Sequence, residues 1–174
     1  MGIQHPLQPG ASLRILASSG EVVVTAEERD DLDVEPPDRH VEMKDGGTAE
    51  VKSRSGSLRV RCPKGTDVSV GVISGRVRLA GEFGSVKVSA VSGHIEIDSA
   101  SGDVDVRSVS GHLSVNTCGG RCQLNTKSGR IRIGWVEMAA RVSTLSGSVE
   151  IGTAGEEEVV VKSISGGVTV RVAE

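Results

Sequence analysis

Residues 92–115 read SGHIEIDSASGDVDVRSVSGHLSV, and this stretch decides the fold. After each Ser-Gly step the residues alternate between aliphatic and polar, as in Ile95, Glu96 and Ile97. Alternation with a period of two is typical of a β-strand with one buried and one solvated face. On a helix with 3.6 residues per turn, the same aliphatic side chains would scatter around the surface. The stretch therefore predicts short strands separated by glycine corners.

The glycines of this stretch belong to a nine-residue repeat. The sequence has 23 glycines in 174 residues. Those at the predicted corners are Gly75, Gly84, Gly93, Gly102, Gly111, Gly120 and Gly129, and then Gly147 and Gly166, with Met138 at one skipped position. A sharp chain reversal needs positive φ or close backbone approach, and glycine allows both because it lacks a Cβ atom. We expect Ser and Thr just before the corners, such as Thr126, to hydrogen-bond along the axis between coils.

A second period of eighteen residues predicts the architecture. Serine precedes glycine at every second corner, as at Ser92 and Ser110, whereas Phe83 and Gly119 precede glycines between them. A coil with two nine-residue sides explains this modulation, because every second corner then stacks on its own kind. The sequence predicts an all-β fold, a single-stranded parallel β-solenoid with two-sided coils of about 18 residues. Right-handed winding is expected from the general preference of parallel crossovers.

The repeats divide the chain into two parts of one domain. Residues 1–54 are predicted to form an irregular β N-terminal cap, with strands near 13–25 and 48–53. Within this cap, Ser19-Gly20 precedes Ser55-Gly56 by the length of two coils, so it keeps the phase of the repeat. Residues 55–174 are predicted to form the solenoid. Its seven coils are counted from Gly56, Gly75, Gly93, Gly111, Gly129, Gly147 and Gly166. No cap is encoded after the last coil, so its edge is either blunted by twist and charge or pairs with a second chain.

The composition argues against several classes of partner. The net charge is −3, and Phe83 and Trp135 are the only aromatic residues, so neither a basic nor a stacking surface for nucleic acid is expected. The sequence has no long apolar run, and its N-terminus lacks a basic segment followed by an apolar one. We therefore expect a cytoplasmic protein without membrane insertion. The three cysteines, Cys62, Cys118 and Cys122, form no CxxC pair and are expected to be reduced, buried thiols.

The sequence resembles a bacterial adhesin-like family with a repeated β-strand domain of unknown function. The resemblance is carried by the segment around Pro63 and Gly65, by Ser74-Gly75-Arg-Val77, and by the Ser-Gly-x-Val-x-Val units from Ser92 to Val170. It covers essentially the whole chain and implies a β-solenoid. Many relatives carry a membrane anchor or an export signal, which is not seen here. Bactofilins are another family of β-solenoids that polymerise end to end, but their corners are usually closer to hexapeptide spacing.

One outward-facing row is a candidate binding site. Residues eighteen apart should lie roughly 5 Å apart along the axis, and the row reads Arg76, His94, His112, Arg130 and Ser148. Its clustered positive charge suggests an anion or an acidic partner, and the alternative is an ordinary solvated surface. His94 and His112 with Glu96 would offer metal ligands, but a flat sheet presents a row and not a tetrahedron, so no metal is predicted. No cofactor is predicted.

Other exposed positions are candidates for contact with proteins. Trp135 lies where a corner glycine is missing, and it either fills the space that the turn leaves, which we favour, or forms a contact patch. The last coil ends on Val168, Val170 and Val172, which we expect to offer a pairing edge. Opposite charges are expected to face each other across strands, as in Arg78 with Glu96 and in Asp103 with Arg121. Such pairs balance the charge of a solvated sheet.

No catalytic motif is present, so the sequence does not predict an enzyme. A glycan-acting enzyme would need an acidic groove, and only Asp103, Asp105 and Glu96 are candidates for one. The predicted function is a non-enzymatic structural or protein-interaction scaffold, with homo-oligomers formed through the C-terminal edge. Two alternatives stay open. One is an anion- or ligand-binding module that uses the basic row, and the other is a self-assembling, bactofilin-like cytoskeletal scaffold.

Overall fold

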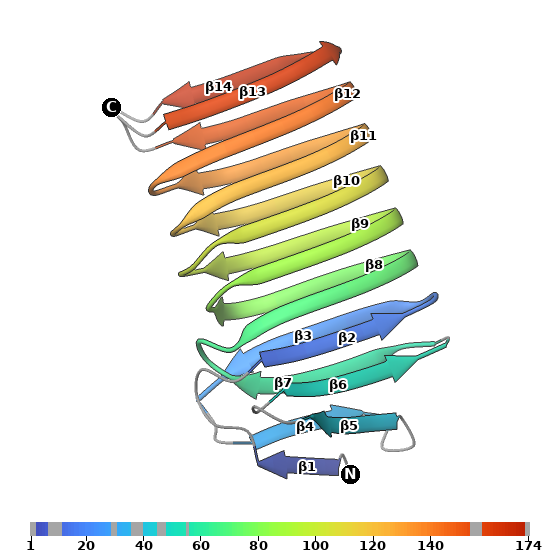
Figure 1. The fold of residues 1–174 in the computed structure, drawn as a ribbon. Helices are drawn as coiled ribbons and strands as arrows, with labels where there is room; N and C mark the ends of the chain where they lie inside the picture. Colours follow the sequence, from blue (N-terminus) through green and yellow to red (C-terminus); the bar gives the residue numbers. More distant parts are fainter. Residues whose placement is uncertain are drawn as a thin grey trace.

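The computed structural model describes residues 3–6, 12–28, 31–35, 40–44, 48–54, 56–153 and 158–172. The elements in these ranges are β-strands, which form one sheet that winds around a common core (Figure 1). The strands are β1 (Ile3–Pro6), β2 (Ser12–Ala17), β3 (Glu21–Glu27), β4 (Asp31–Glu35), β5 (His40–Lys44), β6 (Thr48–Ser53), β7 (Leu58–Pro63), β8 (Asp67–Phe83), β9 (Val86–Ala100), β10 (Val104–Cys118), β11 (Arg121–Val136), β12 (Ala139–Thr153), β13 (Glu158–Ser165) and β14 (Val168–Val172).

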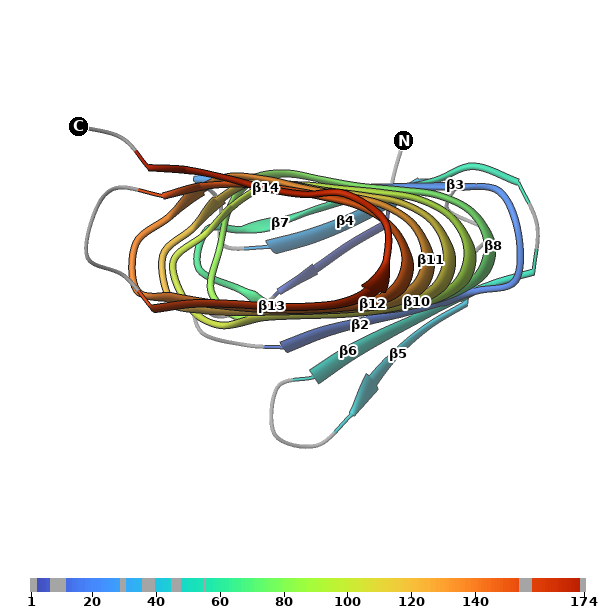
Figure 2. The ribbon, with the colours of Figure 1, turned by 90° about the horizontal axis from the view of Figure 1, so that it is seen from above.

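The central strands β8 to β12 each make one lap of the solenoid. Each pairs in parallel with the next, and Ile95 pairs with Leu113, which pairs with Ile131. Partners eighteen residues apart confirm the predicted two-sided parallel coil. Seen along its axis, the solenoid is a flattened oval whose laps lie over one another (Figure 2). The hand of the winding stays a prediction.

The core lies between the two flat faces of the oval. The predicted alternation is observed, since side chains such as Ile95, Ile97 and Val106 are at most 2% exposed while the residues between them face solvent. Phe83 is fully buried at the point where β8 ends. Burial of one such aliphatic side chain stabilises the fold by about 1.5–3 kcal/mol, so the stacked aliphatic rows are the main source of stability.

The two narrow edges of the oval turn the chain differently. At one, which we call the Ser-Gly edge, the strands continue through the bend. It consists of residues 71–76, 89–94, 107–112, 125–130, 143–148 and 162–167. At the other, the loop edge, β8 to β12 are joined by short turns between one strand and the next. It consists of residues 80–86, 98–104, 116–122 and 134–140.

The sequence analysis gave two reasons for glycine at a corner, positive φ and close backbone approach, and the two edges differ in which of these applies. At the Ser-Gly edge φ is positive, for example +127° at Gly111, and a Cβ there would also overlap the carbonyl oxygen of Gly93. At the loop edge Gly102 has no positive φ, but its Cβ would lie 3.0 Å from the carbonyl oxygen of Gly84. Close approach alone therefore selects glycine at position 102, whereas both reasons apply at position 111. The loop edge also holds one glycine with positive φ, Gly81 at +99°.

The hydroxyl groups three residues before the Ser-Gly glycines do not bond along the axis as predicted, although Ser165, directly before Gly166, does donate to the carbonyl of Leu145 in the neighbouring lap at 3.3 Å. The hydroxyl of Thr126 donates to the carbonyl of Ser128 at 3.1 Å, and that of Thr144 donates to the carbonyl of Ser146 at 3.2 Å. Each bond stays within one lap and closes its own bend. The prediction was wrong because these side chains point inward, towards the carbonyl that the bend turns back on them.

The order of the first laps differs from the chain order. The lap of β2 and β3 lies between the lap of β6 and β7 and strand β8, because β3 pairs with both β7 and β8. β2 likewise pairs with both β6 and β8. Residues 12–27, which the sequence analysis assigned to the irregular cap, thus form a regular lap inside the stack. The Gly56 lap does not lie directly on the Gly75 lap, as successive counting implied, since Gly20 lies between them.

Antiparallel strands finish the N-terminal end of the stack. β4 pairs with β7, β1 pairs with β4, and β5 pairs with β6, all antiparallel. Leu32 and Val34 of β4 are 0% and 1% exposed, so this end of the core is covered. The predicted strands near 13–25 and 48–53 are observed, whereas the antiparallel strands were not predicted.

Candidate functional site

The predicted basic row is formed in the expected register. Arg76 pairs with His94, His94 with His112, and His112 with Arg130 along the parallel ladder. All four side chains are exposed. The two histidine rings meet edge to face, with centroids 4.8 Å apart and planes at 86°. The row runs beside the Ser-Gly edge, one residue after each glycine. Its role in anion binding stays a prediction.

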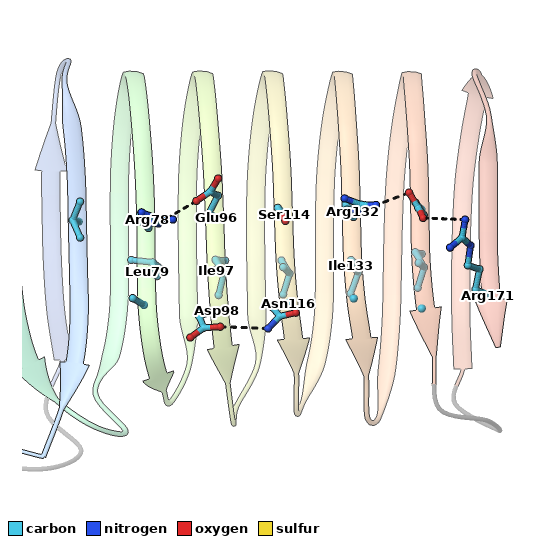
Figure 3. A pocket seen from close by; sticks show the side chains of 17 residues that line it. Arg78, Leu79, Glu96, Ile97, Asp98, Ser114, Asn116, Arg132, Ile133 and Arg171 are labelled. Atoms are coloured by element: carbon cyan, nitrogen blue, oxygen red, sulfur yellow. Dashed lines mark hydrogen bonds and ion pairs between the residues drawn. The ribbon is translucent and has the colours of Figure 1, made fainter. Parts of the chain in front are cut away.

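A second row, of alternating charge, runs beside the first on the same face. The Nε atom of Arg78 lies 3.3 Å from a carboxylate oxygen of Glu96, which confirms the predicted pair (Figure 3). Farther along, Arg132 and Arg171 each lie 3.6 Å from a carboxylate oxygen of Glu150. These pairs are exposed to solvent, so each contributes at most about 1 kcal/mol. Most of the charge in this row is therefore paired within the row.

A shallow groove of about 800 Å³ follows this alternating row across the laps. Its other side is the row of Asp98, Asn116, Gly134 and Gly152, where the last two positions lack side chains. Asn116 donates to Asp98 at 3.4 Å, and the backbone N–H of Gly81 donates to the same carboxylate at 3.3 Å (Figure 3). The sequence analysis missed this groove. The eighteen-residue spacing of Asp98, Asn116, Gly134 and Gly152 is the feature of the sequence that indicates it.

The carboxylate of Asp103 does not pair with the side chain of Arg121 as predicted. Instead Asp103 accepts a hydrogen bond from the backbone N–H of Arg121 at 3.0 Å. Asp67 accepts one from the backbone N–H of Ser85 at 2.9 Å in the same way. In both cases the acceptor and donor are eighteen residues apart, so these aspartates connect adjacent laps at the loop edge. Their role is structural.

The cysteines are buried and form no disulfide. Cys118 and Cys122 flank one turn of the loop edge on its inner side. A hydrogen bond with Cys118, together with burial, raises the pKa of the Cys122 thiol well above its ordinary value. The thiol of Cys122 is therefore neutral and unsuited to nucleophilic chemistry. Among the described residues, no three His, Cys, Asp or Glu side chains cluster to hold a metal ion.

Trp135 lies at the loop edge with 40% of its surface exposed, next to Met138 at 60%. The favoured interpretation, that Trp135 fills the space of a missing turn, is therefore wrong, and the alternative of a contact patch is compatible with its exposure. The ladder pairs Trp135 with Thr117, so the strand does not leave a gap there.

In the last lap, residues of the core pattern are open to solvent. Val168 and Val170 continue the buried rows but are 45% and 43% exposed. β14 pairs with β12 on one side, and no described strand covers its other side. The side chain of Val172 lies outside the described part. No membrane-crossing helix is found in the part of the chain that the structure describes.

The comparisons with known proteins give one family match and several distant solved structures. A family model described as "Toastrack DUF4097" matches residues 6–172. A solved structure described as a "putative cell adhesion protein" from Clostridium sporogenes is 9% identical, with a TM-score of 0.41 and 99% of each chain covered. A "putative adhesin" from Parabacteroides distasonis is 9% identical, with a TM-score of 0.37, covering 99% of this chain and 96% of that one. No curated protein matches the chain. The structural similarities are too low to carry a functional argument.

Proposed function

This chain belongs to the Toastrack DUF4097 family, and we propose that it is a non-enzymatic scaffold whose C-terminal end pairs with a second copy of itself. The family match confirms the resemblance that the Ser-Gly repeats predicted. The observation that carries the proposal is the contrast between the two ends of the stack. Leu32 at the N-terminal end is fully buried, whereas Val168 at the other end is 45% exposed.

An uncovered end of a β-solenoid is a surface ready for strand pairing. Its outer strands present backbone N–H and C=O groups in a regular row, and such edges pair with another chain unless something covers them. Here β13 and β14 both pair with β12, and their outer sides face away from the stack (Figure 1). Exposed Val168 and Val170 would be covered by the same contact.

The most economical arrangement is a symmetric dimer of two C-terminal ends. A two-fold axis across the end would place β14 antiparallel to β14 of the second copy, and β13 antiparallel to β13. The two cores would then become continuous, so the valines on both sides would be buried together. A rigid rod of twice the length would carry the same rows of side chains on both halves.

Light scattering over a range of protein concentrations tests this proposal. We expect the full chain to form dimers at higher concentration and the double variant Val168→Lys, Val170→Lys to stay monomeric. A matched control is Val91→Lys, Val109→Lys, because these valines are as exposed as the end valines but lie at the Ser-Gly edge. A wild-type monomer at every concentration, or equal loss of dimer in both variants, would contradict pairing at the end.

A second candidate function is anion binding by the basic row. The observation that favours it is the register that aligns Arg76, His94, His112 and Arg130 on one exposed line. We expect His94→Ala with His112→Ala to weaken the binding of inorganic phosphate in calorimetry while leaving the melting temperature unchanged. Absence of phosphate binding to the wild-type chain would remove this candidate.

A further inference from the structure

The Ser-Gly edge carries a row of exposed aliphatic side chains. The position two residues before each glycine is occupied by Ile73, Val91, Val109, Lys127, Leu145 and Ile164. The five aliphatic members are 43–78% exposed, whereas aliphatic side chains on the flat faces of β8 to β12 are buried. Five steps of about 4.8 Å give the row a length of roughly 24 Å. An apolar row of this length on a solenoid edge marks an interaction surface.

Positive charge flanks this aliphatic row on both sides. Within the six segments of the Ser-Gly edge there is no Asp or Glu. The charged residues are Arg76, Arg107, Lys127, Arg130 and Lys162, and Arg107 lies 3.7 Å from a carboxylate oxygen of Asp105, which is just outside the edge. The four segments of the loop edge instead contain Glu82, Asp98, Asp103 and Glu137, with Arg121 as their one cation. The net charge of −3 thus hides two edges of opposite sign.

The shape of the edge limits the kind of partner. The laps bend into a narrow, rounded end beside the labels of β8, β10 and β11, so the aliphatic row stands on a convex ridge (Figure 2). A second rod would meet this ridge with its own convex edge and bury only a thin line of contact. A lipid surface is soft and deforms around a ridge, so it can cover the whole row.

A groove continues the apolar surface at the N-terminal end of the row. Its volume is about 870 Å³, and Leu16, Gly71, Ile73 and Val91 line it. Leu16 packs over Gly71, where a Cβ would lie 3.2 Å from its Cδ2 atom, and Leu16 is 37% exposed. Lys52 and Arg54 also line the groove, and Lys52 lies 3.1 Å from Glu50. The groove widens the apolar surface beside the ridge without adding a net negative charge that would repel an anionic headgroup.

We propose that the Ser-Gly edge binds an anionic lipid surface. The aliphatic row enters the boundary between headgroups and acyl chains, and the flanking Arg and Lys side chains contact lipid phosphates. This inference deepens the anion-binding candidate by naming the chemistry of its partner, and it is independent of dimer formation at the C-terminal end. The cations and the aliphatic row are both needed, because the cations attract the protein to the anionic membrane surface while the aliphatic side chains keep the Ser-Gly edge inserted in that surface.

Vesicle co-sedimentation of the full chain tests the proposal. We expect binding to vesicles of phosphatidylcholine with phosphatidylglycerol and weak binding to phosphatidylcholine alone. The triple variant Arg107→Gln, Lys127→Gln, Arg130→Gln should lose about a hundredfold in affinity, since each cation near an anionic surface contributes about a factor of five. The triple variant Val91→Ser, Val109→Ser, Leu145→Ser should lose about tenfold while keeping its charge.

The matched control is Arg121→Gln with Met138→Ser at the loop edge, which should bind like the wild type. All variants change exposed side chains, and circular dichroism melting checks that they fold. The proposal is overturned if the wild-type chain binds neutral and anionic vesicles equally, or binds neither. It is also overturned if soluble polyglutamate competes fully and the serine variant binds normally, because the occupant is then an acidic protein. If the chain binds inorganic phosphate but no vesicles, the lipid proposal is overturned and only anion binding by the basic row is supported.

Discussion

The Ser-Gly edge and the loop edge reverse the same chain every nine residues, but they do so by different physics. The Ser-Gly edge bends a continuous strand through a glycine with positive φ and closes the bend with a hydroxyl from the same lap. The loop edge ends the strand, and at two of its turns an aspartate of the neighbouring lap accepts a hydrogen bond from the backbone. One edge is stabilised within each lap and the other between laps, which predicts different responses to substitution.

The largest difference is expected for glycine. Gly111→Ala would combine positive φ with overlap of the carbonyl oxygen of Gly93, and we expect it to lower the free energy of unfolding by more than about 3 kcal/mol. Gly102→Ala meets backbone at 3.0–3.1 Å without positive φ, and we expect about 1 kcal/mol. Urea denaturation measures both. Equal losses would show that the two edges do not differ in this way.

A smaller difference is expected for the hydrogen bonds of the two edges. Asp103→Ala removes a charged acceptor from the N–H of Arg121, and we expect a loss of about 1.5 kcal/mol in the free energy of unfolding. Asp103→Asn keeps an acceptor oxygen and should lose less. Thr126→Val at the Ser-Gly edge removes a bond within one lap and should lose about 1 kcal/mol. If Asp103→Asn proves as costly as Asp103→Ala, the aspartate does not act through this bond.

The smallest effect is a pH dependence confined to the loop edge. The folded state holds the proton of Cys122 through a raised pKa, whereas the unfolded chain releases it near the ordinary thiol pKa of 9.0. Above that pH the unfolded state binds fewer protons, so stability should fall by up to about 1.4 kcal/mol per pH unit. Urea denaturation between neutral and alkaline pH measures this slope.

The matched variant is Cys122→Ala, which copies the alanine that the ladder places opposite it at Ala140. This variant should be less stable at neutral pH but should show a shallower decline above the thiol pKa. An identical alkaline slope in the wild type and the variant would exclude Cys122 as the source.

The repeat made most of the fold predictable. Eighteen-residue spacing predicted which residues form rows, and the ladder from His94 to His112 follows it. The order of the first laps was not predictable, because Val22 and Val24 have the same pattern as Leu58 and Val60. Periodicity identifies the residues that form a lap, but it does not determine which two laps are neighbours in the stack.

The candidate site was predictable only in part, because alternation fails at a bend. Val88 and Ile95 both point inward although seven residues separate them, so one step of the alternation is lost at Gly93. Val91 lies an odd number of positions after Val88 and faces solvent, whereas strict alternation counted back from Ile95 would place it in the core. The exposed aliphatic row of the Ser-Gly edge could not be recognised without the backbone conformation of these glycines.

Disulfide formation between engineered cysteines tests the stacking of the laps most directly. The account places Ser114 beside Arg132 in the parallel ladder, whereas Gln123 lies half a lap away on the opposite face. We predict that Ser114→Cys with Arg132→Cys forms a disulfide under mild oxidation, and that Ser114→Cys with Gln123→Cys does not. A disulfide in the second pair and none in the first would contradict the eighteen-residue lap and every row derived from it.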